Sequence, residues 1–216
     1  MIYQNIQIKK LKHATFQIFW NDKVIYIDPF RLENNLPKAD YLFITHEHFD
    51  HFNPDDIRKI LKEETKIITI ELVAKEIKTW INNDNLIIVE PNNYYEIDDF
   101  SFQTTSAYNI NKFRAPGEVF HPKEDKRVGY VLNLDGVKIY HCGDTDFIEE
   151  MKKLKDIDVA LICVSGTYVM TPEEAAEAVN YFKPKIAIPM HYGEIVGSID
   201  DAYKFKELAK VEVIID

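Results

Sequence analysis

The sequence at positions 41–51 is YLFITHEHFDH, an apolar run followed by a cluster of histidines and carboxylates. The run from Tyr41 to Ile44 predicts a buried strand, which would deliver the cluster to the rim of a sheet. In an extended loop, residues two apart project to the same side, so His46 and His48 can chelate one ion. Asp50 and His51 follow as the chain begins to wind and can bind a second ion nearby. The segment therefore predicts a metal site whose ligands here are His46, His48, Asp50 and His51.

The residues after this cluster predict the start of a helix. Asn53 fits an N-cap, Pro54 fits the first helical position, and Asp55 and Asp56 give an acidic first turn. A helix that begins here would hold the ligand loop from behind. Imidazole and carboxylate groups suit zinc, manganese or iron. The alternative is a chance cluster of histidines on a solvated loop.

The spacing of the cluster resembles the His-x-His-x-Asp-His signature of the metallo-β-lactamase superfamily. Further segments with this resemblance are Gly143-Asp144-Thr145, Pro189-Met190-His191-Tyr192-Gly193, His13-Ala14-Thr15-Phe16 and Asp28-Pro29. Together they are most similar to the lactonase-like branch, near the ascorbate-6-phosphate lactonases and the N-acyl-phosphatidylethanolamine phospholipases. The resemblance covers nearly the whole chain. It implies an α/β fold, the four-layer αββα sandwich, as a single hydrolase domain over residues 1–216.

The resemblance also implies the composition of the site. It implies two divalent ions, for which zinc or manganese is preferred. It also implies that Asp144 bridges the two ions and that His191 is the last ligand. From the residues alone, Asp144 is a turn carboxylate after a glycine and His191 is a histidine after a strand. We expect His13 and Asp28 to support the ligands from behind rather than to bind an ion.

One motif departs from the family pattern. Relatives in the lactonase-like branch place a ligand histidine just after an Ala-aromatic pair, whereas this chain has Ala107-Tyr108-Asn109. Asparagine is a poor replacement for imidazole at a borderline metal, so another residue should supply the nitrogen. His121 is preferred because it belongs to the same connection, and His141 is the alternative.

Residues 107–126 predict a long irregular loop, which we interpret as a flap over the site. Its positive charges in an otherwise acidic chain could attract a phosphate or carboxylate of the substrate, although an ordinary solvated loop is an equal alternative. These charges are Lys112, Arg114, Lys123 and Lys126.

Composition limits the classes of function. The chain has 216 residues and a formal net charge of -10, which disfavours a general nucleic-acid binder. No apolar run approaches the roughly 20 residues of a membrane span, and no secretory signal opens the chain, so a cytoplasmic location is expected. Cys142 and Cys163 predict no disulfide framework. A thiolate ligand at Cys142 is conceivable, but packing is favoured.

Hydrophobic periodicity predicts the remaining elements. The expected helices cover residues 71–81, 147–154 with a Glu149–Lys153 pair, 171–182 with a capping box, and 198–209. Strand-like runs alternate with them, and Asp135-Gly136 predicts a hairpin turn. Helices packed outside a sheet fit this alternation.

These observations predict a metal-dependent hydrolase. A metal-bound hydroxide would attack a small, anionic lactone or ester, with Asp50 and Asp144 as catalytic carboxylates. Candidate donors to an oxyanion or leaving group are Tyr168, His141 and Tyr192. The alternatives are a phosphodiesterase, a metal-binding regulatory protein without turnover, and a di-iron redox enzyme. The redox enzyme is disfavoured because the chain contains no flavin-binding partner domain. The expected partner is a small molecule, and homo-oligomerisation stays open.

Overall fold

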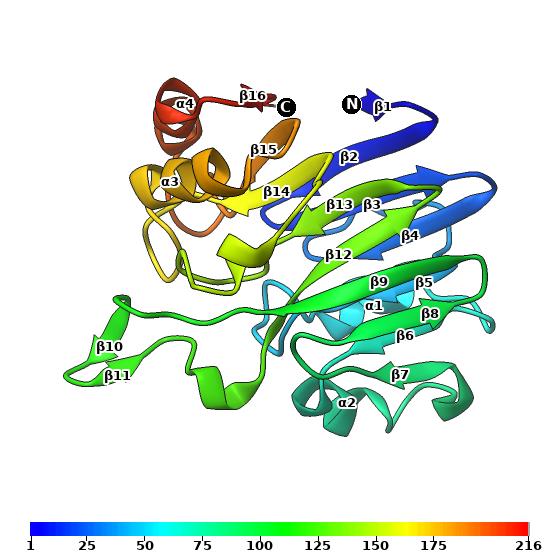
Figure 1. The fold of residues 1–216 in the computed structure, drawn as a ribbon. Helices are drawn as coiled ribbons and strands as arrows, with labels where there is room; N and C mark the ends of the chain where they lie inside the picture. The colour runs from blue at the N-terminus through cyan, green and yellow to red at the C-terminus, as the bar shows by residue number, and fades with distance from the viewer. Residues whose placement is uncertain (216) are drawn as a thin grey trace. The chain divides into compact units, whose positions relative to one another are not determined.

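The computed structural model describes residues 1–215, which fall into two compact units, Met1–Val89 and the residues from Glu90 onward. Each unit is built around one seven-stranded sheet (Figure 1). In both sheets one half is antiparallel and the other half is parallel. The prediction of a single domain over residues 1–216 stays a prediction.

The sheet of the first unit has the order β1-β2-β3-β4-β5-β6-β7. The strands from β1 to β4 are antiparallel, and those from β4 to β7 are parallel. All of β5 is buried, as its apolar sequence predicts. The strands are β1 (Ile2–Tyr3), β2 (Ile6–Lys12), β3 (Thr15–Trp20), β4 (Lys23–Ile27), β5 (Tyr41–Phe43), β6 (Lys66–Thr69) and β7 (Leu86–Ile88).

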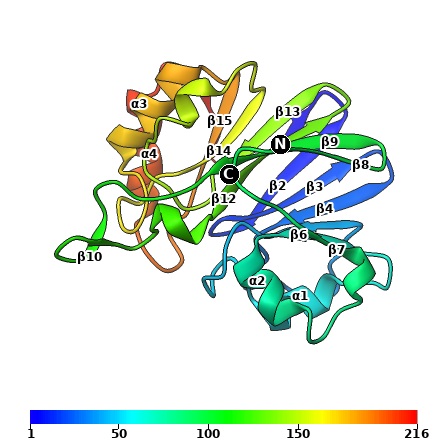
Figure 2. The same ribbon diagram turned by 60° about the horizontal axis from the view of Figure 1, so that its bottom comes forward.

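Two helices, α1 (Pro54–Ile60) and α2 (Glu71–Ile77), pack beside the parallel half of this sheet (Figure 2). The prediction of a helix to residue 81 is wrong, because α2 ends at Ile77. At the end of α2 the backbone hydrogen bonds span three residues instead of four, as in a 3₁₀ turn. The Thr79 N–H donates to the Glu76 carbonyl, and the Trp80 N–H donates to the Ile77 carbonyl. A 3₁₀ turn, Asn83–Asn85, then leads to β7.

The sheet of the second unit has the order β16-β15-β14-β13-β12-β9-β8. The strands from β13 to β16 are parallel, and β8, β9, β12 and β13 are antiparallel. The strands are β8 (Tyr94–Ile97), β9 (Phe100–Ser106), β12 (Val128–Leu134), β13 (Val137–His141), β14 (Val159–Cys163), β15 (Ile186–Met190) and β16 (Glu212–Val213). The predicted hairpin joins β12 to β13 through Asp135 and Gly136.

Helices α3 (Pro172–Phe182) and α4 (Ile199–Leu208) lie beside β14 and β15 (Figure 1). The predicted capping box of α3 is confirmed: Thr171 accepts from the Glu174 N–H, and Glu174 accepts from the Thr171 N–H. The predicted helix at 147–154 is wrong, since only a 3₁₀ turn forms, Met151–Lys153. Apolar residues three apart, such as Ile148 and Met151, suit a 3₁₀ period as well as an α-helical one, and Glu149 pairs with Lys152 instead of Lys153.

The segment 107–126 is more regular than its sequence predicts. It contains a two-stranded hairpin, β10 (Phe113–Ala115) and β11 (Glu118–Val119), and a 3₁₀ turn, Lys123–Asp125. Figure 1 shows this hairpin projecting from the rest of the second unit. We call residues 110–120 the arm. Among the described residues, no helix is long and apolar enough to cross a bilayer.

Candidate metal centre

The ligand loop of the first unit runs from the carboxyl end of β5 to α1. The backbone N–H groups of His51 and Phe52 both donate to the His48 carbonyl, at 2.9 and 2.8 Å, so the loop winds into a tight turn. Asn53 then caps α1 by accepting from the Asp56 N–H at 3.1 Å. The turn and the cap fix the direction of the ligand side chains, as the helix-start signal predicts.

Asp28 joins the hydrogen bonds behind this loop. Its Oδ1 accepts from the Thr45 backbone N–H at 2.8 Å, and its Oδ2 accepts from the Thr45 hydroxyl and from His51 Nδ1, both at 2.7 Å. A carboxylate only accepts, so His51 Nδ1 carries a proton, and the neutral ring has its lone pair on Nε2. The Thr45 hydroxyl gives its proton to Asp28 and so accepts from His46 Nδ1 at 2.9 Å. His46 therefore holds the same tautomer.

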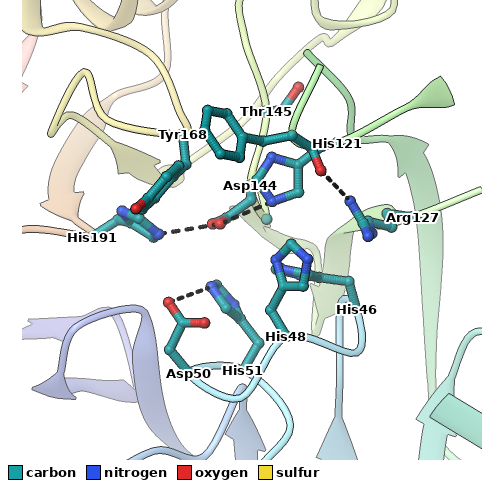
Figure 3. A network of polar contacts seen from close by, with 12 residues as sticks. His46, His48, Asp50, His51, His121, Arg127, Asp144, Thr145, Tyr168 and His191 are labelled. Carbon is teal, nitrogen blue, oxygen red and sulfur yellow. Dashed lines mark hydrogen bonds and ion pairs between the residues drawn. The ribbon is translucent and has the colours of Figure 1, made fainter. Parts of the chain in front are cut away.

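The Nε2 atoms of these rings face other polar atoms of the first unit (Figure 3). His46 Nε2 lies 3.2 Å from His48 Nδ1, and His51 Nε2 lies 3.7 Å from Asp50 Oδ2. His13 Nε2 lies 3.1 Å from the same Asp50 oxygen. His13 thus contacts a predicted ligand directly, and the expectation that it supports the ligands without binding an ion stays a prediction.

In the second unit, Asp144 follows β13 and faces two buried imidazoles (Figure 3). His191 Nε2 lies 3.1 Å, and His121 Nε2 3.4 Å, from Asp144 Oδ2. The Ser165 hydroxyl donates to the Thr167 carbonyl at 3.3 Å and so accepts from His191 Nδ1 at 3.1 Å. The Asn109 side-chain oxygen accepts from His121 Nδ1 at 2.8 Å. Because the Nδ1 atom of each ring is held by an oxygen, both rings turn Nε2 toward the Asp144 carboxylate.

His141 and Cys142 differ from these residues. His141 Nδ1 accepts from the Gly143 N–H at 3.2 Å, so its proton is on Nε2, the opposite tautomer. Cys142 Sγ lies 3.4 Å from Cys163 Sγ. Burial and this neighbour raise the pKa of the Cys142 thiol well above its usual value. A thiol held protonated is a poor metal ligand, which favours packing for Cys142.

Tyr168 has a strained backbone in the loop after β14. Its φ of 68° lies in the left-handed region, which is uncommon for a side chain of this size. Its ring packs edge-on against Phe120 at 4.6 Å between ring centroids and is 37% exposed. Strain of this kind gathers at functional sites, and the exposed ring keeps Tyr168 a candidate for substrate contact.

Sequence reasoning missed the residues that fix the imidazoles. Thr45 and Ser165 each orient a histidine, and buried Arg127 donates to the Phe120 carbonyl at 3.1 Å, directly before His121 (Figure 3). The sequence does indicate Thr45 and Ser165, because each is a polar residue directly after an apolar run, where a strand ends. The partner of Arg127 depends on the path of the arm, which no local pattern encodes.

The four cations of the flap are held by carboxylates. Lys112 contacts Asp146 at 3.2 Å and Glu174 at 2.7 Å, and the others pair with Glu118, Glu150 and Glu90. Paired charges attract an anionic substrate less strongly than isolated ones. The structure therefore gives the expected anion attraction no support.

The donors in both units fit divalent metal ions. Ligand atoms about 2.0–2.2 Å from a shared tetrahedral ion lie roughly 3.3 Å apart, and the Nε2-to-carboxylate distances of His13, His121 and His191 are 3.1 to 3.4 Å. Metal-binding histidines commonly have the second ring nitrogen held by an oxygen acceptor. His46, His51, His121 and His191 all satisfy this condition.

Comparisons with known proteins agree with this chemistry. Residues 7–191 match the β-lactamase superfamily domain. The chain is 31% identical to a UPF0173 metal-dependent hydrolase of Thermococcus onnurineus, over 97% of this chain and 96% of that protein. Among solved structures, a candidate metal-dependent hydrolase of Parabacteroides distasonis has 32% identity and a TM-score of 0.83, over 97% of this chain and 92% of that one.

A more distant structure extends the likeness in fold. Igni18, a metallo hydrolase of Ignicoccus hospitalis, has a TM-score of 0.75 and 23% identity over 97% of this chain and 95% of that one. The predicted α/β fold class is therefore confirmed. With its histidine and aspartate groups and these relatives, the chain belongs to the metallo-β-lactamase superfamily.

Proposed function

We propose that this chain is a metal-dependent hydrolase of small lactones or esters, and that its predicted ligands hold two divalent ions, zinc or manganese. The observation that carries the proposal is that the Nε2 atoms of two buried imidazoles, His191 and His121, lie 3.1 and 3.4 Å from Asp144 Oδ2. The proposed ligands are His46, His48, Asp50, His51, His121, Asp144 and His191, with His13 beside them.

A metal ion explains this arrangement better than a proton does. Lone pairs that face one another in a buried site repel unless a cation lies between them. One proton can bridge only one of the two imidazoles to Asp144, whereas a divalent ion accepts several donors at once. The opposite tautomer of His141 supports His121 over His141 as the third-motif ligand.

The proposed chemistry follows from the donor set. Bound divalent ions would supply a hydroxide nucleophile near neutral pH and a Lewis acid for the scissile carbonyl. Asp50 and Asp144 are the catalytic carboxylates, with Asp144 as the shared ligand. Asp28, Thr45 and Ser165 hold the rings so that no reorientation is needed during the reaction.

An exposed aromatic residue favours an ester or lactone over a phosphodiester. Phe49 lies between His48 and Asp50 in the loop, is 63% exposed, and meets Phe30 edge-on at 5.9 Å between ring centroids. An apolar surface beside the ligands suits the acyl part of a substrate better than a phosphate. Hydrolysis of a phosphodiester and metal binding without turnover are the alternatives.

The test combines metal content with hydrolysis of three substrate classes. We expect two zinc or manganese ions per chain by plasma mass spectrometry, and turnover of a lactone or carboxylic ester above that of a phosphodiester. His48→Ala and Asp144→Asn should each lose metal, and with it at least about 100-fold in kcat/KM. The control for metal content is His141→Asn, which keeps an acceptor for the Gly143 N–H.

Other results would change the conclusion. Faster turnover of the phosphodiester than of the lactone or ester would make the protein a phosphodiesterase. Two bound ions without any turnover would favour a metal-binding regulatory protein. Iron with visible absorption would favour redox chemistry. An unchanged metal content in both ligand variants would overturn the proposed centre.

A further inference from the structure

We propose that Asn109 is the positioning residue for His121: its amide fixes the tautomer and direction of the ring, so that a ligand can come from the far end of the arm. The inference rests on the proposed function, because it concerns one of the proposed ligands.

The hydrogen bonds of the Asn109 side chain fix the orientation of its amide. Its Oδ1 accepts from the His121 backbone N–H at 2.9 Å and from His121 Nδ1 at 2.8 Å. Its Nδ2 donates to Asp146 Oδ1 at 3.2 Å and to the Tyr168 carbonyl at 2.8 Å. The two partners of Nδ2 are acceptors and the backbone partner of Oδ1 is a donor, so only this orientation of the amide satisfies all of them.

The contact fixes the chemistry of the ring. An amide oxygen has no proton to give, so His121 Nδ1 is the donor, and the neutral ring has its lone pair on Nε2. Nε2 is also the atom that lies 3.4 Å from Asp144 Oδ2. Asn109 therefore does more than fill space, because it selects the tautomer that can bind a metal ion through the nitrogen facing Asp144.

The same residue also closes the base of the arm. Asn109 N–H donates to the His121 carbonyl at 2.8 Å, so the two residues are joined by backbone as well as side-chain hydrogen bonds. Asp146 fixes the start of the arm by accepting from the backbone N–H groups of Ile110 and Asn111, at 2.6 and 2.9 Å. His121 is thus held at a fixed place although the intervening hairpin projects from the unit.

Asparagine is better suited to these contacts than side chains of similar size. The substitution Asn109→Asp would keep an acceptor for His121 but would place a second oxygen against the Asp146 carboxylate and the Tyr168 carbonyl. The substitution Asn109→Leu would remove all the side-chain hydrogen bonds and leave buried polar groups unsatisfied. We therefore expect Asn109→Leu to lose both the tautomer and the direction of the ring, and Asn109→Asp to keep the tautomer only.

The first experiment uses the metal-free wild-type protein. Long-range ¹H–¹⁵N correlation spectra at about pH 8, where an ordinary histidine is neutral, report which ring nitrogen of His121 carries the proton. His121→Ala is used to assign the signals. We expect the proton on Nδ1. A proton on Nε2 would overturn the inference, whatever the behaviour of the Asn109 variants.

The second experiment measures metal affinity by competition with a chromophoric chelator. Asn109→Leu should weaken one zinc site by roughly 10- to 100-fold, as is typical when a residue that orients a ligand is lost, and Asn109→Asp should weaken it less. The matched control is Asn180→Leu, because the Asn180 amide is also hydrogen-bonded, to the Leu208 carbonyl and the Lys210 N–H, and contacts none of the proposed ligands.

The two proposals fail in different ways. Full metal content in His121→Ala would show that His121 is not a ligand, which contradicts the ligand set of the proposed function. Loss of metal in His121→Ala, with wild-type affinity and an unchanged tautomer in Asn109→Leu, would contradict the positioning role alone.

Discussion

At the scale of single residues, the site is defined by which nitrogen of each histidine carries the proton. The sequence spacing predicts which histidines approach a sheet edge, because the positions follow apolar strands. It does not predict the tautomers, because these depend on partners such as Ser165, which is 26 residues from His191. The hydrogen bonds between Asn109 and His121 could not be predicted from the sequence, because they form only after the arm has folded back.

Asp28→Asn tests the importance of a fixed tautomer in the first unit. The carboxylate accepts from Thr45 and His51 through the same Oδ2 atom, and an amide NH₂ at that position would require His51 Nδ1 to accept instead. The proton would then move to Nε2, and we expect metal affinity to fall by about 10- to 100-fold. Chelator competition measures this, with exposed Asp22→Asn as the control. Equal affinity in both variants would contradict the assignment.

At the scale of elements, long apolar strands and capped helices follow their sequence signals, whereas short segments do not. The α3 capping box and the β12–β13 hairpin appear where predicted. The expected helix at 147–154 becomes a 3₁₀ turn, because apolar residues spaced three apart fit both periods. The arm was expected to be irregular, and its hairpin depends on anchoring by Asp146 and α3.

Glu174 connects that anchoring to the acid stability of α3. Burial alone would raise the pKa of Glu174, but hydrogen bonds from Lys112, Asn111 and the Thr171 N–H outweigh it and hold the pKa below its usual value. A carboxyl group with a lowered folded-state pKa stabilises the fold above its unfolded pKa of about 4.3. This contribution is lost as the pH falls through the folded-state pKa.

Glu174→Gln should therefore flatten the acid side of the stability profile. At pH 7 the free energy of unfolding should fall by about 1 kcal/mol or less, because the pair is partly solvated. Between about pH 5 and pH 3 the variant should lose less stability than the wild type. Urea titrations at several pH values measure both effects, and exposed Glu177→Gln on the same helix is the control. Parallel profiles for wild type and Glu174→Gln would refute the linkage.

At the scale of the whole molecule, the fold class was predictable because the motifs of the family lie along nearly the full chain. The α/β class and the superfamily are confirmed by the match over residues 7–191 and by the solved relatives. The division into two compact units was not resolved from the sequence, since both units share the same strand and helix periodicities.

Metal removal should lower the stability of the chain. An ion that binds only the folded state stabilises it by about 2.7 kcal/mol at 100 times its dissociation constant. For a chain of this size that corresponds to a rise in Tm of roughly 5–10 °C. Thermal unfolding with zinc, with manganese and with excess chelator measures the difference, and the Asp144→Asn variant should show little response. An identical Tm with and without chelator in the wild type would argue against tight binding.

The hydrogen bonds between Asn109 and His121 have a consequence for engineering. Since the two ends of the hairpin hold each other, the number of residues between them is uncoupled from the place of the histidine. Residues 113–119 could then be exchanged for an unrelated peptide, such as a fluorophore tag or an affinity epitope, while the centre stays intact.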